Sequence, residues 1–137
     1  IRRFHEAKEN NLDEVVVWGS GTPMREFLYV DDMAQASLYV QSLGQDTYLK
    51  NTEPMLSHIN VGTGIDVTIK ELAENVMDVV GFVGKLVFDK SKPDGTMRKL
   101  MNVERLGFLG YIAPTSLRSG LELAYADFLE NAPSLRM

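Results

Sequence analysis

The chain has 137 residues, of which 45% are hydrophobic and 24% are charged, a composition typical of a globular domain with a core of its own. Its formal net charge of −5 argues against nucleic-acid binding, which needs a basic face. The absence of cysteine excludes disulfides and thiolate metal sites. Because no apolar run approaches the ~20 residues of a membrane span and no secretion signal is visible, we expect a cytoplasmic protein without membrane contact.

The first predicted elements are a helix and two short strands. Residues 2–10 are predicted to be helical, with no capping residue before them. Because the chain also begins without methionine, at Ile1, we expect residues 1–137 to be the carboxyl-terminal part of a longer protein. Residues 15–18 form a continuous β-branched run ending in tryptophan, which predicts a strand buried on both faces. Residues 26–30 predict a second short strand.

A helix follows, from Asp31 to about Leu43. Asp31 is the predicted N-cap, and Asp32 lies in the first turn, where the helix dipole favours a negative charge. Apolar residues recur along this segment at helical spacing. Residues 44–56 are polar and turn-rich, which predicts a loop with a helical turn.

Residues 57–61 predict a third strand, which the Gly-Thr-Gly turn at residues 62–64 ends. Thr68 and Glu71 then have the spacing of a capping box, in which the hydroxyl and the carboxylate satisfy each other's backbone donors. The helix that this box opens has an apolar stripe along one side and is predicted to end at Gly81.

The remaining elements are short. Residues 85–88 predict a strand, residues 89–99 a charged loop around a Pro-Asp-Gly turn, and residues 103–106 one or two helical turns. A last helix is predicted to open at residues 114–116, and the chain from Ala132 is expected to be frayed. Strands and helices therefore alternate, which predicts a small α/β layer that packs against a larger partner.

Residues 18–25 read Trp-Gly-Ser-Gly-Thr-Pro-Met-Arg and are the first candidate site. An arginine fork takes phosphate oxygens in pairs, and an indole face can pack against a ring, so Arg25 beside Trp18 suits a nucleotide. A hairpin with a surface arginine explains the segment equally well. On residue types alone both interpretations remain open.

The loop at residues 92–99 is the second candidate. Asp94 could accept hydrogen bonds from sugar hydroxyls while Arg98 or Lys99 meets a phosphate. Loop chemistry alone favours an ordinary solvated charged loop. Arg3, on the first predicted helix, is a further basic candidate, although a single arginine on a helix is usually solvated.

Several motifs argue against chemistry carried out by this chain alone. The Gly-Thr-Gly turn at residues 62–64 lies where a dinucleotide loop would lie, but Val67 takes the place of the third glycine, so a tight turn into a capped helix is favoured. The sequence contains no Tyr-x-x-x-Lys, no G-x-S-x-G and no H-E-x-x-H. Its two histidines, His5 and His58, do not build a metal site.

These residues nevertheless resemble a known family. The segment from Val15 to Asp32, with Arg-Glu-Phe-Leu-Tyr-Val-Asp-Asp at its end, is similar to the opening of the substrate domain of GDP-L-fucose synthases. The similarity continues through His-Ile-Asn-Val-Gly-Thr-Gly at residues 58–64, Lys-Pro-Asp-Gly-Thr at residues 92–96 and Arg-Lys-Leu at residues 98–100. It covers nearly the whole chain, and its more general part is shared by many extended short-chain dehydrogenases.

The resemblance implies an NADPH-dependent enzyme that epimerises GDP-4-keto-6-deoxy-mannose at C3 and C5 and then reduces C4 to give GDP-L-fucose. In this family the amino-terminal half carries the Rossmann domain, the Ser-Tyr-Lys group and the residues proposed for epimerisation. We therefore expect residues 1–137 to be a mixed α/β substrate-binding domain without catalytic residues, cofactor or metal of its own. Its partners would be the GDP-sugar and its own amino-terminal Rossmann domain, and the whole protein would be a homodimer.

The resemblance also implies which residues bind the substrate: Arg3, Trp18, Arg25, Asp94 and Lys99. Arg25 and Lys99 are expected at the diphosphate, Trp18 at the wall of the nucleotide-sugar pocket, and Asp94 at a hydroxyl. Arg3 stands at a position that is usually basic in the family.

The sequence departs from the family pattern at a few places. Met97 replaces a usual proline, Tyr29 a frequent histidine, and Tyr111 a common tryptophan; none of these is a candidate ligand. Two other functions stay open: a free-standing GDP-sugar binding module, and part of a sister epimerase or dehydratase that acts on another nucleotide sugar.

Overall fold

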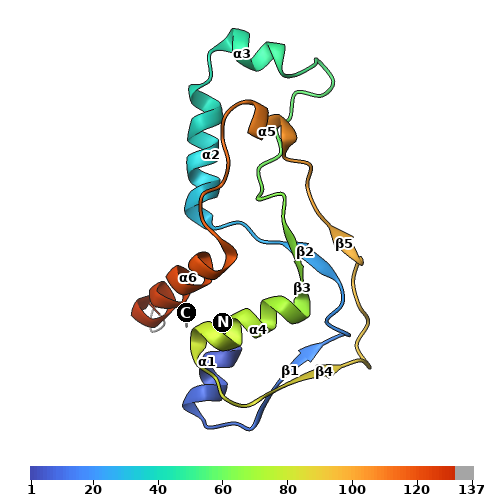
Figure 1. Cartoon of the computed structure of the whole chain (residues 1–137), viewed down its shortest axis with the longest axis vertical. Helices are drawn as coiled ribbons and strands as arrows, with labels where there is room; N and C mark the ends of the chain where they lie inside the picture. The colour runs from blue at the N-terminus through green and yellow to red at the C-terminus, as the bar shows by residue number, and fades with distance from the viewer. Residues whose placement is uncertain (132–137) are drawn as a thin grey trace. The chain divides into compact units, whose positions relative to one another are not determined.

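A computed structural model describes residues 1–131 as a mixed α/β chain (Figure 1), so the end expected to fray lies outside the described residues. The elements in chain order are α1 (Arg2–Glu9), β1 (Glu14–Trp18), β2 (Met24–Glu26), α2 (Val30–Ser42), α3 (Gln45–Lys50), β3 (Asp66–Thr68), α4 (Ile69–Val80), β4 (Lys85–Asp89), β5 (Arg98–Lys99), α5 (Glu104–Phe108) and α6 (Leu117–Asn131).

The chain forms two compact units. The first unit comprises residues 1–25, 67–99 and the segment from Ser116, and the second comprises residues 26–66 and 100–115. The boundary between them falls inside strands β2 and β3.

Among residues 1–131, no helix is both long enough and apolar enough to cross a membrane.

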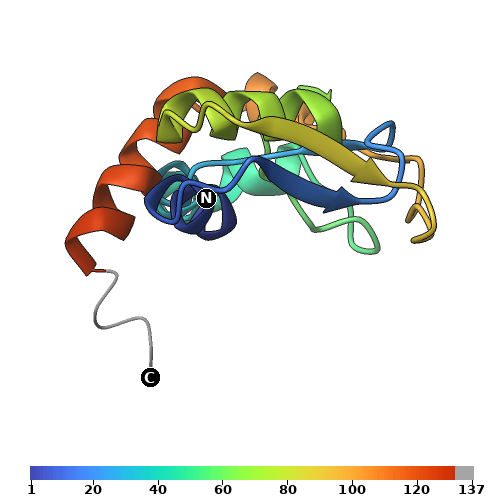
Figure 2. The same cartoon turned by 90° about the horizontal axis from the view of Figure 1, so that it is seen from below.

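The first unit is built on a parallel pair of strands. Strand β1 pairs with β4 from Glu14 opposite Lys85 to Trp18 opposite Asp89, and Figure 2 shows the two arrows side by side. Its core combines aromatic and aliphatic side chains of α1, β1 and α4 with the residue that follows Gly81: Phe4, Ala7, Val15, Ala73, Val76, Val80 and Phe82. Helix α6 adds the half-buried Leu121 and Tyr125.

Strand β1 is where predicted, but the prediction that both its faces are buried is wrong. Val15 is 3% exposed, whereas Val16 is 37% and Trp18 is 67% exposed. Within the described residues β1 has β4 as its neighbour and packs on the core with one face. Because side chains alternate along a strand, every second residue is left outside the core, and Trp18 is one of them.

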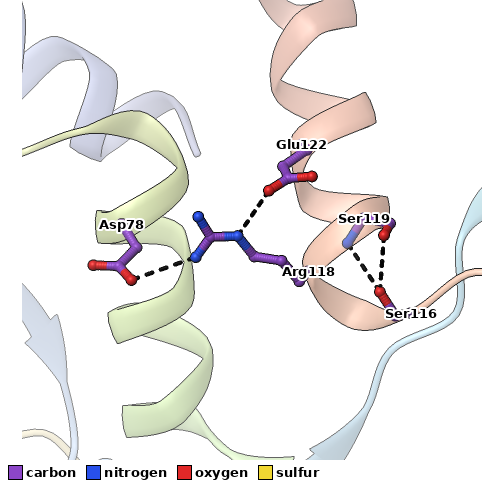
Figure 3. A network of polar contacts seen from close by, with 5 residues as sticks. All are labelled: Asp78, Ser116, Arg118, Ser119 and Glu122. Carbon is purple, nitrogen blue, oxygen red and sulfur yellow. Dashed lines mark hydrogen bonds and ion pairs between the residues drawn. The ribbon is translucent and has the colours of Figure 1, made fainter.

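Helix α4 confirms the predicted capping box. The Glu71 carboxylate accepts the Thr68 backbone N–H at 2.7 Å, and the Glu71 N–H donates to the Thr68 hydroxyl oxygen at 3.0 Å. The helix ends at Gly81, whose φ of 71° is left-handed, a conformation that costs glycine little. Helix α6 is tied to α4 by Arg118, whose guanidinium contacts Asp78 and Glu122 (Figure 3).

Two predictions for the start of the second unit are wrong. The strand predicted at residues 26–30 is instead β2, which ends at Glu26. Helix α2 begins at Val30 with Tyr29 as its N-cap, so Asp31 is not the cap. Residues 27–29 form no strand, and the extended backbone of Tyr29 leads directly into the first turn of the helix.

The strand predicted at residues 57–61 is also absent; the strand in this region is β3, further along the chain. Arg105 Nη1 donates to the carbonyl oxygens of Leu56 and His58 at 2.8 and 2.7 Å. Backbone groups that would join a ladder are therefore bound by a side chain. The helical turn expected in residues 44–56 is confirmed as α3.

Candidate functional site

Arg25 and Lys99 form the cationic part of the candidate site. Strands β2 and β5 are parallel, and Arg25 is directly opposite Lys99. Residues in register on neighbouring strands, about 4.8 Å apart, project to the same face, so the two cations lie side by side. Like charges in this arrangement repel, and an anion bound between them removes that repulsion.

The end of the predicted charged loop is a strand, which corrects the expectation for residues 89–99. The Met24 N–H donates to the Met97 carbonyl at 2.7 Å, and this bond starts the pairing of β5 with β2. As a result Lys99 has a defined place on a sheet, although its side chain is exposed. Arg98 is opposite Met24 in the same pairing.

The loop before β5 passes close to the Arg25 guanidinium. A Cβ atom at Gly95 would lie 3.3 Å from Arg25 Nη2, so a glycine allows the backbone to approach closely. The other end of the guanidinium is held by the chain itself, because Nη1 donates to the Met24 carbonyl at 2.6 Å. Arg25 is therefore half-buried and oriented, which suits a side chain that binds an anion.

Asp94 binds the turn that follows β1. Its Oδ1 accepts the backbone N–H of Ser20 at 2.8 Å, and its Oδ2 accepts the Ser20 hydroxyl at 2.6 Å. The bond from the serine side chain, followed by the bond from its backbone, holds the pKa of Asp94 below its ordinary value. The hydroxyl that Asp94 meets here belongs to the protein, and its predicted contact with a ligand hydroxyl stays a prediction.

Trp18 ends β1 with its ring largely exposed. The Nζ atom of Lys92 lies 5.7 Å from the ring centroid, within the range of a cation–π contact. The turn that follows is anchored by the Gly19 N–H, which donates to the Asp89 carbonyl at 2.9 Å. Sequence reasoning did not single out Lys92 or Ser20, since only the folded chain brings them to Trp18 and Asp94.

Arg3 reaches from α1 to the neighbouring strand. Its Nη1 donates to the Val16 carbonyl at 2.8 Å. Arg3, Val16 and Trp18 share the lining of a hollow of about 350 Å³. The predicted ligands Arg3, Trp18, Arg25, Asp94 and Lys99 therefore all belong to the first unit.

The Gly-Thr-Gly turn of the second unit holds a carboxylate. The Gly64 N–H donates to Glu26 Oε1 at 2.6 Å, and a Cβ atom at Gly62 would overlap the same oxygen. Glu26 Oε2 also accepts the Met101 N–H at 3.2 Å. A negative pyrophosphate does not fit where Glu26 already lies, which agrees with the structural interpretation of this turn.

No group of His, Asp or Glu side chains within residues 1–131 could hold a metal ion.

The comparisons with known proteins indicate the class of protein that this fold resembles. Residues 1–62 match the NAD dependent epimerase/dehydratase family. The structure is similar to GDP-mannoheptose C4 reductase from Campylobacter jejuni with NADP bound, with a TM-score of 0.81 and 36% identity over 93% of this chain and 42% of that chain. A GDP-L-fucose synthetase from Naegleria fowleri bound to NADP gives a TM-score of 0.81 and 27% identity over 97% and 39%. The mixed α/β chain thus has the fold of this epimerase and reductase class.

Within this class the chain is related to the GDP-L-fucose synthases. It is 60% identical to GDP-L-fucose synthase of Escherichia coli (strain K12) over 136 residues, which are 99% of this chain and 42% of that relative. The resemblance inferred from the motifs is therefore confirmed. The chain spans well under half the length of the curated relatives it matches.

Proposed function

We propose that this chain is the GDP-sugar-binding part of a GDP-L-fucose synthase, which epimerises GDP-4-keto-6-deoxy-mannose at C3 and C5 and reduces C4 with NADPH. The observation that carries the proposal is the pairing of Arg25 with Lys99 on one face of the β2–β5 ladder, in a chain 60% identical to a GDP-L-fucose synthase.

The geometry supports a nucleoside diphosphate as the group that binds. Two adjacent cations match the adjacent phosphates of a diphosphate, and the planar Arg25 fork can meet two oxygens at once. The exposed ring of Trp18, at the end of the neighbouring β1 segment, can pack on a flat or apolar face of the nucleotide sugar. Arg3 adds positive charge beside Trp18, on the hollow that both residues line.

NADPH would supply the hydride for the reduction. The site described above offers it no pyrophosphate cradle, because Glu26 occupies the Gly-Thr-Gly turn. We infer that the dinucleotide and the proton-donating tyrosine belong to an amino-terminal Rossmann domain, and that the whole enzyme is a homodimer. On its own this chain is expected to bind the GDP-sugar without converting it, since hydride transfer needs both groups.

Calorimetric titration of the chain with GDP, UDP and dTDP tests the proposal. GDP is expected to bind most tightly, because the guanine-containing nucleotide is the one the related synthases use. A preference for UDP or dTDP would favour a sister epimerase or dehydratase instead. Absence of binding to any diphosphate would contradict a nucleotide-sugar site on this chain.

A free-standing GDP-sugar binding module is the second candidate. The Arg25–Lys99 pair supports it equally, because the pair accounts for binding of a diphosphate and not for reduction of the sugar. Addition of NADPH and the keto sugar to the complete gene product separates the two. Oxidation of NADPH is the result expected for the synthase, and binding without oxidation is the result expected for the module.

A further inference from the structure

One serine fastens the loop between β4 and β5 to the turn after β1. Asp94 accepts the backbone N–H of Ser20 on one carboxylate oxygen and the Ser20 hydroxyl on the other. Two bonds to different oxygens fix the plane of the carboxylate, and bonds to a charged acceptor are stronger than neutral ones. The two residues are 74 positions apart in the chain, and their bonds add to the Gly19–Asp89 backbone bond and the Lys92–Trp18 contact that join the same two segments.

The hydrogen-bonding capacity of the Ser20 hydroxyl is fully used. It gives its single proton to Asp94, so its oxygen can only accept from other groups. That oxygen accepts the Thr22 backbone N–H at 3.1 Å and lies 2.7 Å from Thr22 Oγ1, whose hydroxyl must therefore be the donor. One donor and two acceptor positions are filled, which leaves a single arrangement of protons while Asp94 is ionised.

Glycines on both segments allow this close approach. Gly19 has a φ of +88°, and a Cβ atom there would overlap Asp94 Oδ1, so a side chain at position 19 would push the loop away. Next to Asp94, Gly95 lies against the Arg25 guanidinium. Between the Gly19–Asp89 bond and the Met24–Met97 bond that hold its two ends, the loop is held near Trp18 and Arg25 by the bonds between Ser20 and Asp94.

We propose that Ser20 and Asp94 form a clamp that holds the two sides of the nucleotide-sugar site at a fixed separation, with Ser20 as a positioning residue. One side is the turn that carries Trp18, and the other is the loop that leads to Lys99. Ser20 acts on the ligand through the segments it joins, without touching it. The identity of the ligand rests on the proposed function, whereas the clamp itself rests on the contacts of Ser20.

Trp18 makes the clamp observable without ligand, because it is the single tryptophan of the chain. Ser20→Ala is expected to change the emission of Trp18 and to weaken GDP binding about three- to tenfold, the order expected for a lost hydrogen bond. Ser20→Thr keeps the hydroxyl and is expected to restore both. Ser91→Ala is the matched control: it removes a serine–aspartate bond of 2.6 Å to Asp89 in the same loop, one that bridges no distant segments.

Acid provides a second readout. The Ser20 bonds lower the pKa of Asp94, so loss of the hydroxyl should raise that pKa and move the acid transition of Trp18 emission to higher pH. The charged groups on the adjoining segments are Lys92, which contacts the Trp18 ring, Arg25, which lies against Gly95, and Asp89, whose carbonyl accepts the Gly19 N–H. Asp94→Asn is expected to remove the transition, because Asp94 is the group that we propose as its source.

A double-mutant cycle on GDP affinity separates the clamp from direct ligand contact. If Ser20→Ala and Asp94→Ala disrupt one clamp, the double variant binds GDP as weakly as the weaker single variant. If the fold-losses of GDP affinity in the two single variants multiply in the double variant, Asp94 contacts the ligand directly. That result would contradict the proposal that Asp94 acts through its bonds to Ser20. Unchanged GDP affinity, emission and acid transition in Ser20→Ala also overturn it, with the proposed function intact. If the wild-type chain binds no GDP, the proposed function fails. The clamp is then tested by the Trp18 emission and acid transition of Ser20→Ala compared with those of the wild type.

Discussion

Arg25 and Lys99 are direct neighbours in the parallel ladder of β2 and β5, so two cations are held on one face. Neighbouring like charges destabilise a sheet, whereas the diphosphate that we propose as ligand would be bound by the same pair. The proposal therefore predicts that the free energy of unfolding and the ligand affinity depend on the same two residues, in opposite directions.

Arg25→Ala is expected to weaken GDP binding by about 1.5–3 kcal/mol, the range for hydrogen bonds to charged groups. The planar fork meets phosphate oxygens in pairs, which water cannot replace at equal strength. Titration calorimetry measures the change. Arg118→Ala is the matched control, because Arg118 bonds Asp78 and Glu122 on α4 and α6 (Figure 3); equal losses in both variants would point to a general effect of charge.

Lys99→Ala is expected to have two effects of opposite sign. Without ligand, relief of the repulsion with Arg25 should raise the free energy of unfolding by up to about 0.5 kcal/mol. With ligand, the loss of a phosphate contact should lower GDP affinity. Urea unfolding with and without saturating GDP measures both. A variant that is less stable without ligand would contradict the proposed repulsion.

The capping box of α4 predicts a contribution to acid unfolding. Hydrogen bonds from the Thr68 backbone and then its side chain lower the pKa of Glu71. A depressed carboxyl pKa means that this stabilisation is fully present above the unfolded-state pKa and is lost as the pH falls through the lower folded-state pKa. Glu71→Gln keeps the capping geometry and should flatten the pH dependence of unfolding in that acid range.

Thr68→Ala complements this test. It removes the hydroxyl that accepts the Glu71 N–H and is expected to lower the free energy of unfolding by about 1 kcal/mol at neutral pH. Thermal unfolding across a pH series compares the two variants. If Glu71→Gln unfolds in acid with the wild-type pH profile, other carboxyls carry the transition.

Asp32→Ala is expected to destabilise the second unit. Asp32 is 1% exposed, and its carboxylate accepts both the backbone N–H and the hydroxyl of Thr115 at 3.0 and 2.8 Å. Loss of the acceptor leaves the partly buried N–H and hydroxyl of Thr115 without this partner, at a cost of about 1.5–3 kcal/mol for a hydrogen bond to a charged group. Asp31→Ala, at the exposed neighbour in the same first turn of α2, is the control and should cost less in urea unfolding. Equal effects would assign the loss to the helix dipole instead.

Local signals in the sequence predicted the capped helix α4 and the positions of strands β1 and β4 well. The spacing of Thr68 and Glu71, the glycine at position 81 and the β-branched run of β1 each depend on neighbours in the chain, so residue types suffice to find them. The motifs of residues 18–25 and 92–99 also pointed to the segments that meet in the first unit, although their contact with a ligand is still a prediction.

Two predictions failed or were incomplete because a side chain far away in the sequence forms hydrogen bonds that local patterns do not reveal. Arg105 binds the carbonyls of the segment predicted as a third strand, and Asp32, expected only to favour the helix dipole, holds Thr115. The predicted two-sided burial of β1 failed because a continuous apolar run does not reveal how many neighbours a strand has.

The sequence by itself determined the two ends of α4 and the residue types suited to a nucleotide sugar, because these depend on short-range spacing, and its motifs carried the resemblance to the GDP-L-fucose synthases. Tertiary structure alone decided that Arg25 lies beside Lys99, that Glu26 fills the Gly-Thr-Gly turn and that Asp94 is bound by Ser20. Each of these contacts joins residues far apart in the chain, and their hydrogen bonds and repulsions exist only once folding brings those atoms within a few ångströms.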